Sequence, residues 1–163
     1  MTKRRKVIIA ILIIAVVGVA IWGLVPVQPV GLTVAIALDS DTFVEGDEIV
    51  LHARIVNDSD KAAKILEPSL ADITFEVALF DERGMRYDYL GPYSVKPFGR
   101  NAGRYLNPGE TVTLEVALDK FFALPAGRYR VAAAYRTLNY PRVRVPFCRI
   151  PSNELTFELL PSE

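Results

Sequence analysis

The chain has 163 residues, 51% of them hydrophobic, and its 19 Lys and Arg balance its 19 Asp and Glu. Four of the basic residues stand at positions 3–6, so the rest of the chain carries 15 basic against 19 acidic residues. This mildly acidic balance argues against nucleic acid as a partner, because nucleic-acid-binding domains carry basic patches. The single cysteine, Cys148, excludes an internal disulfide, so the domain depends on its hydrophobic core.

The N-terminal segment predicts a membrane anchor. A basic cluster at positions 3–6 precedes 19 uncharged residues, 7–25. As a helix these would extend about 28 Å, close to the ~30 Å hydrocarbon core of a bilayer. The basic cluster favours the cytoplasmic side. We therefore expect a cytoplasmic tail over 1–6, a transmembrane helix over 7–25, a short proline-containing linker over 26–31, and a periplasmic or extracellular domain over 32–163.

A cleaved signal peptide is the alternative interpretation of the same segment. Its apolar region would be residues 7–17, with Gly18-Val19-Ala20 as a cleavage site of small residues. Against this, the hydrophobic run continues to Val25 without a polar break. An uncleaved anchor, which holds the protein on the membrane through residues 7–25, is the preferred prediction.

Alternation of apolar and polar residues predicts strands throughout the outer domain. The expected strands cover residues 32–38, 49–55, 73–79, 112–118, 129–135 and 155–159, with a shorter seventh over 85–90. Turn-forming residues separate them, and no long amphipathic helix is present in the pattern. The fold class predicted is all-β, an immunoglobulin-like antiparallel β-sandwich of about seven strands preceded by one N-terminal transmembrane helix.

Two stretches carry a resemblance that supports this fold. Residues 107–119 read NPGETVTLEVALD, and residues 122–131 read FALPAGRYRV. This pattern resembles extracytoplasmic immunoglobulin-like domains of the bacterial proteinase-inhibitor type and of the N-terminal part of deuterolysin-like peptidases. The resemblance implies a structural tyrosine at a strand corner, Tyr129, and a last strand opened by Ser152-Asn153. It also implies protease inhibition as one alternative function, although no inhibitory loop can be matched residue by residue.

Residues with catalytic or metal-binding chemistry are few. His52, the only histidine, falls on the polar face of a predicted strand, without partners at zinc-ligand or triad spacing, and is expected to be exposed. Five acidic residues could suggest calcium, but their spacing favours a solvated turn. They are Asp39, Asp41, Glu45, Asp47 and Glu48. Asn57-Asp58-Ser59 is formally a glycosylation acceptor. The prediction is a protein that is not an enzyme, with no catalytic, cofactor or metal site.

Tyrosine and arginine concentrate in two segments, 86–106 and 140–149. These residue types carry much of the binding energy in protein interfaces. The candidate partner-binding residues are Tyr87, Tyr89, Tyr93, Phe98, Arg100, Arg104, Tyr105, Tyr140, Arg142 and Arg144. The alternatives are that the aromatic rings cap the open ends of the sandwich or that they form a carbohydrate-binding platform.

The function expected from these features is that of a single-pass, membrane-anchored extracytoplasmic interaction or assembly module. Such a module could serve as an accessory subunit of an envelope or membrane complex, with another protein as its partner. A protease inhibitor of immunoglobulin-like fold and a carbohydrate-binding module remain as alternatives.

Overall fold

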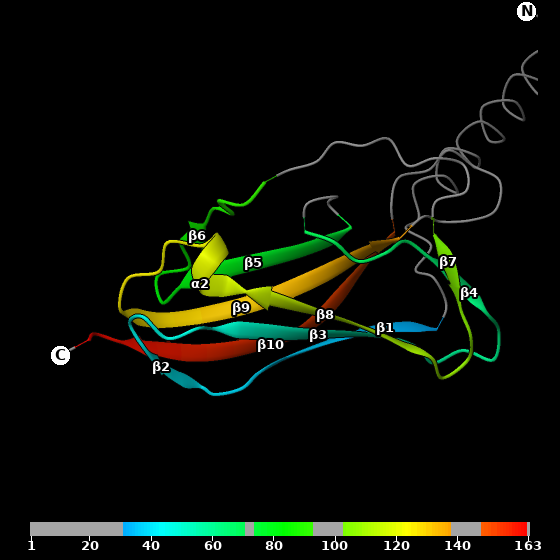
Figure 1. Cartoon of the computed structure of the whole chain (residues 1–163), viewed down its shortest axis with the longest axis horizontal. Coiled ribbons are helices and arrows are strands. Elements are labelled where there is room, and N and C mark those ends of the chain that lie inside the picture. Colours follow the sequence, from blue (N-terminus) through cyan, green and yellow to red (C-terminus); the bar gives the residue numbers. More distant parts are fainter. Residues whose placement is uncertain (1–30, 71–73, 93–102, 138–147, 163) are drawn as a thin grey trace, which may run out of the picture.

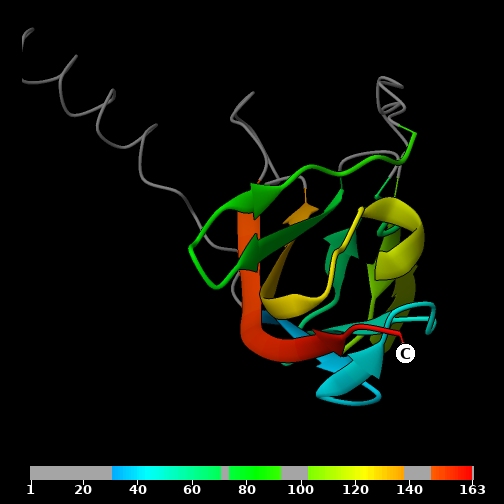
Figure 2. The same ribbon diagram turned by 90° about the vertical axis from the view of Figure 1, so that its left-hand side faces the viewer.

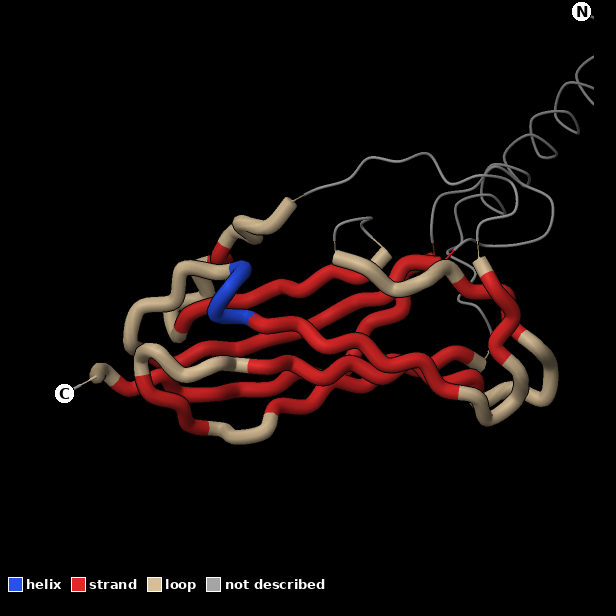
Figure 3. The backbone as a smooth tube through the Cα atoms, in the orientation of Figure 1, coloured by secondary structure: helices blue, strands red, loops and turns tan. Residues whose placement is uncertain are grey.

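The computed structural model describes residues 31–70, 74–92, 103–137 and 148–162 (Figure 1). Within these ranges the regular secondary structure consists of strands apart from one short helix (Figure 3). The elements are β1 (Leu32–Leu38), β2 (Thr42–Val44), β3 (Val50–Asn57), β4 (Ala63–Ile65), β5 (Phe75–Asp81), β6 (Arg86–Tyr87), β7 (Arg104–Leu106), β8 (Thr111–Ala117), α2 (Leu118–Phe121), β9 (Gly127–Thr137) and β10 (Cys148–Leu160). The all-β prediction is confirmed.

The strands form two main sheets. One has the order β1-β3-β8, and the other has the order β2-β10-β9-β5-β6. A separate pair, β4 and β7, lies at one end of the molecule, whereas β6 and α2 lie at the opposite end (Figure 1). Neighbouring strands are antiparallel except for β2, which runs parallel to β10.

The core fills the space between the two sheets. Alternate residues of each strand face inward, as in β1, where Leu32, Val34 and Ile36 are buried and the residues between them are exposed. One continuous cluster joins inward side chains of β1, β3 and β8 with those of β5, β9 and β10. Burial of each such aliphatic side chain contributes about 1.5–3 kcal/mol. Because a chain with one cysteine cannot form an internal disulfide, this hydrophobic cluster is the main source of the domain's stability.

Tyr129 has the structural role that the resemblance implied. Its hydroxyl donates a hydrogen bond to the backbone carbonyl of Pro125, four residues upstream. Its ring stacks on Phe157, with 5.3 Å between ring centroids, and meets Tyr87 edge-on at 5.6 Å. Burial, and then the hydrogen bond with Tyr87, hold the pKa of Tyr129 well above its usual range. The residue therefore closes the corner at which the chain enters β9.

The resemblance implied that Ser152 and Asn153 open the last strand, and this prediction is wrong. β10 begins at Cys148, and these two residues occupy an irregularity in its pairing with β9. There the Asn153 side chain accepts a hydrogen bond from the backbone N–H of Ile36 (2.8 Å) and donates one to the carbonyl of the same residue (3.0 Å). Since Ile36 belongs to β1, one amide links the edges of the two sheets.

The predicted strand over 85–90 shortens to β6, because tertiary contacts draw the chain away from the sheet. The backbone N–H of Leu90 donates to the carbonyl of Phe121 at 2.8 Å, which ties this segment to α2. The predicted strand over 112–118 likewise ends one residue early, where α2 begins at Leu118. The prediction also missed three strands of three residues each, which are β2, β4 and β7.

The predicted membrane helix over 7–25, together with the tail over 1–6 and linker residues 26–30, lies outside the described residues. Among the residues that the structure describes, no helix is long and apolar enough to cross a membrane.

Candidate functional site

Two of the predicted partner-binding tyrosines lie at the β6–α2 end of the sandwich. Tyr87 is in β6, and Tyr89 follows it. The ring of Tyr89 packs against those of Phe121 and Phe122, with centroid distances of 5.3 and 6.0 Å. Both tyrosines are half-buried, so a large part of each ring closes this end of the core. Figure 2, which looks at this end, shows the chain that follows β6 running across to α2.

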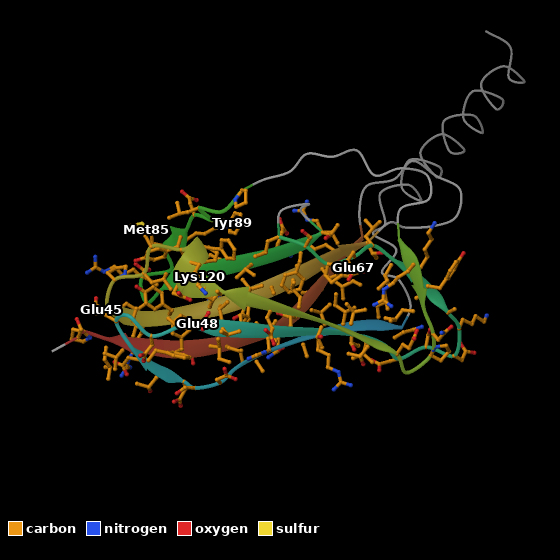
Figure 4. All side chains as sticks on the ribbon, viewed as in Figure 1. Glu45, Glu48, Glu67, Met85, Tyr89 and Lys120 are labelled. Atoms are coloured by element: carbon orange, nitrogen blue, oxygen red, sulfur yellow. The ribbon has the colours of Figure 1, made fainter. Side chains whose placement is uncertain are left out.

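Exposed apolar side chains flank these tyrosines. Met85 is 65% exposed and Leu90 is 66% exposed, and both belong to the segment that carries Tyr87 and Tyr89 (Figure 4). We call Met85, Tyr87, Tyr89, Leu90 and Phe121 the β6–α2 surface. Met85 and Leu90 are absent from the predicted set, which consists of tyrosines, arginines and one phenylalanine. Their position could have indicated exposure, because these two apolar residues lie at the ends of a short segment whose tyrosines pack on the core.

Charged groups lie near the β6–α2 surface. Lys120 of α2 is 2.6 Å from a carboxylate oxygen of Glu48. The hydrogen bond to Glu48 raises the pKa of Lys120. Glu45 accepts a hydrogen bond from the backbone N–H of Ala126 at 3.0 Å. An apolar centre with a polar rim is the usual anatomy of a protein interface.

Of the remaining predicted residues, the two that the structure describes do not join this surface. Arg104 and Tyr105 belong to β7, at the opposite end of the sandwich (Figure 1). Arg104 pairs with Glu67, with 3.4 Å between Nε and Oε2, and Tyr105 is 65% exposed. The other six candidates lie outside the described residues. They are Tyr93, Phe98, Arg100, Tyr140, Arg142 and Arg144.

His52 lies on the outer, polar face of the three-stranded sheet, as predicted, with 40% of its side chain exposed. Its Nε2 is 3.1 Å from Oδ1 of Asp39, and its Nδ1 is 3.5 Å from Oε1 of Glu115. Neither carboxylate was predicted as a partner of His52, because they become its neighbours only through strand pairing. Glu115, for example, stands directly opposite His52 in β8.

The acidic residues near β2 mostly serve local structure. Asp47 accepts a hydrogen bond from the backbone N–H of Val44 (2.8 Å), and Glu45 and Glu48 have the partners given above. The chain forms a short strand, β2, within the segment that was predicted as a turn. In the described ranges no group of three or more His, Cys, Asp or Glu residues is placed to hold a metal ion.

Comparisons with known proteins include two distant structural likenesses. No protein-family model matches the chain, and no curated protein matches it. A CARDB domain from Pyrococcus furiosus, in complex with di-metal ions, is similar over 80% of this chain and 94% of its own, with 16% identity and a TM-score of 0.41. An alkylpurine DNA glycosylase from Pseudomonas fluorescens, bound to DNA with an abasic-site analogue, is similar over 80% of this chain and 30% of its own, with 13% identity and a TM-score of 0.40.

Proposed function

We propose that the chain is a single-pass, membrane-anchored extracytoplasmic protein whose immunoglobulin-like domain binds another protein through the β6–α2 surface. It would act as an accessory subunit of an envelope or membrane complex. The observation that carries the proposal is the exposure of Met85 and Leu90 beside tyrosines whose rings are held by the core. Tyrosine rings that the core already holds lose little conformational entropy when a partner binds.

The strand order supports the immunoglobulin-like assignment. Taking the six long strands in chain order, the first, second and fourth (β1, β3 and β8) form one sheet. The third, fifth and sixth (β5, β9 and β10) lie together in the other. In immunoglobulin-like sandwiches strands A, B and E likewise face strands C, F and G. The hydroxyl bond of Tyr129 to Pro125 corresponds to the tyrosine corner of that fold.

The fold also relates the anchor to the binding surface. β1 begins at Leu32, at the end of the sandwich that holds β4 and β7 (Figure 1). The proposed linker has six residues, which reach at most about 20 Å. A membrane helix over 7–25 would therefore keep the β1 end near the bilayer. The β6–α2 surface, at the opposite end, would then face away from the membrane, where a partner can approach.

The location can be tested by cysteine labelling in intact cells. In a Cys148→Ser background, we expect a membrane-impermeant maleimide to label Ser162→Cys before lysis and Thr2→Cys only after lysis. The intact mass should stay at 18.1 kDa, as for an uncleaved chain. Labelling of Thr2→Cys in intact cells would contradict the orientation. A shorter, soluble product without the N-terminus would show that the segment is a cleaved signal peptide.

The interaction can be tested by photo-cross-linking of the full chain in its native membrane. A photoreactive amino acid in place of Leu90 should cross-link to one defined protein. Adding Met85→Ser should lower the yield at least about fivefold, since truncation of a central interface residue costs ~1 kcal/mol or more. Tyr105→Ser, equally exposed at the opposite end, is the matched control and should leave the yield unchanged.

The cross-linking result also separates the alternative functions. A protease as the cross-linked protein would favour the inhibitor function. Equal cross-linking from probes at Leu90 and Tyr105 would contradict a specific β6–α2 surface. Retention of the chain on an immobilised glycan without a protein partner would favour the carbohydrate-binding function.

A further inference from the structure

The outer face of the five-stranded sheet has a floor of small side chains. Ala78 of β5 is opposite Ala132 of β9, and Glu76 is opposite Ala134. Larger side chains stand on either side of these alanines, with Phe80 toward one end of β5 and Arg136 toward one end of β9. The result is a hollow of about 320 Å³. We call it the arginine hollow, because three arginines line it: Arg86, Arg136 and Arg149.

Positive charge exceeds negative charge in the arginine hollow. Arg136 donates a hydrogen bond to one oxygen of Glu76, and Nε of Arg149 is 3.3 Å from the other oxygen. One carboxylate thus serves two guanidinium groups. The side chain of Arg86, which is opposite Phe80 on the neighbouring strand, has no ion pair or hydrogen bond with the rest of the described chain. Three arginines against one glutamate leave an excess charge of +2.

Arg136 also keeps an unused donor. Its Nε is buried and has no hydrogen-bond partner among the described residues. A buried N–H without a partner is costly, so native structures rarely leave one. Arginine binds oxyanions through two parallel N–H···O bonds, but this Nε has almost no accessible surface, so the case for an anion rests on the charge excess.

A larger hollow on the same sheet differs in its charge. It measures about 510 Å³, and Arg128 and Arg130 line it. Both of these arginines are paired, with 3.4 Å between Arg128 and Glu158 and 3.0 Å between Arg130 and Glu154. Asp41, Asp81 and Glu82 also line this larger hollow and add negative charge. Of these two hollows, only the arginine hollow has an excess of positive charge.

We propose that the arginine hollow is a binding site for an organic phosphate monoester. Its dianion would balance the excess charge of +2, and its oxygens would accept hydrogen bonds from Arg86, Arg136 and Arg149. The organic part would lie on the methyl groups of Ala78 and Ala132. This site differs from the proposed protein interface in its ligand and in its use of the outer face of β5 and β9, although Arg86 lies in β6 between Met85 and Tyr87 of the β6–α2 surface.

Phenyl phosphate is the probe, titrated into the full chain in detergent micelles with ¹³C-labelled alanine methyl groups. We expect saturable shifts at the methyls of Ala78, Ala132 and Ala134, with a dissociation constant of about 1 mM or below. Benzoate, a monoanion with the same ring, should bind at least about fivefold more weakly, because arginine–oxyanion bonds gain from the second charge. Equal binding of benzoate would overturn the assignment to a dianion.

Variants locate the site. Arg86→Gln and Arg149→Gln should each weaken binding of phenyl phosphate about tenfold, as expected for loss of a charged hydrogen bond. Arg83→Gln, in the exposed turn before β6, removes the same charge and should change affinity less than about twofold. Ala132→Leu should abolish the shifts by filling the floor. Absence of saturable shifts in the unmodified protein, or equal weakening by Arg83→Gln, would overturn the proposal.

Discussion

Replacing Asn57 with leucine is expected to lower the free energy of unfolding by about 3 kcal/mol. Asn57 ends β3 and is fully buried. Its Nδ2 donates to the carbonyls of Lys61 (2.7 Å) and Leu106 (2.8 Å). Its Oδ1 accepts from the backbone N–H and the hydroxyl of Ser59, at 3.1 and 2.6 Å. Leucine has a similar volume but removes all four bonds. The Ser59 hydroxyl and the Lys61 carbonyl still bond each other at 2.8 Å, whereas the buried carbonyl of Leu106 loses the Asn57 donor. A buried group without its partner costs ~1–3 kcal/mol.

Urea denaturation of the full chain in detergent measures this effect. The unfolding of the domain is monitored by far-UV circular dichroism. Asn107→Leu is the matched control, because Asn107 is an exposed turn residue and surface substitutions change stability by less than about 0.5 kcal/mol. Equal stability of Asn57→Leu and the unmodified chain would show that the amide does not hold β3 to the segments around β4 and β7.

The same geometry decides the status of the formal glycosylation acceptor. Asn57-Asp58-Ser59 fits the acceptor pattern, but glycosylation requires an accessible Asn57 Nδ2. In the folded domain both of its N–H donors are used by backbone carbonyls. A glycan at Asn57 is therefore incompatible with this fold. The three-residue pattern could not show this, because Leu106, one of the bonding partners, is 49 residues away.

The long strands could be predicted from the sequence because their periodicity reports one buried face. β1 occupies the range predicted for it, and β3, β5, β8, β9 and β10 each overlap a predicted strand. The short strands could not be predicted, since three residues show too little alternation. β4 forms because it pairs with β7, about 40 residues later in the chain, and β2 forms because it lies along β10. Such pairing is a property of the tertiary structure.

The candidate site was predictable only in part, for a related reason. A tyrosine that closes the end of a core and a tyrosine that faces a partner have the same sequence signature. Contacts of Tyr89 with Phe121 and Phe122 decide that much of its ring serves the core. Conversely, Met85 and Leu90 have the composition of buried residues, yet the turn at Asp81 and the bond of Leu90 to α2 leave their side chains exposed.

Stability of the domain is expected to fall steeply as the pH rises from 10 to 12, and Tyr135 accounts for part of this fall. Tyr135 is fully buried, and its hydroxyl donates to the carbonyl of Leu66 at 2.6 Å. Burial raises the pKa of Tyr135 from 10 to about 12. Between these values the folded chain keeps the proton that the unfolded chain has released, so unfolding becomes more favourable with rising pH.

The contribution of Tyr135 is fully present below pH 10 and is lost as the pH passes 12. A shift of this size corresponds to roughly 3 kcal/mol. Tyr135→Phe should be less stable than the unmodified chain at neutral pH by about 1–2 kcal/mol, because the buried carbonyl of Leu66 loses its donor. Since phenylalanine cannot ionise, the difference between the two proteins should shrink or reverse toward pH 12.

Urea denaturation at several pH values across this range measures the slope for each protein. Tyr105→Phe is the matched control, because Tyr105 is 65% exposed, and it should leave the slope unchanged. Some slope should remain in Tyr135→Phe, since burial also raises the pKa of Tyr129. If Tyr135→Phe and the unmodified chain lose stability in parallel, Tyr135 does not control the alkaline transition. A shallower slope for Tyr135→Phe alone would tie that transition to the burial of this ring between the two sheets.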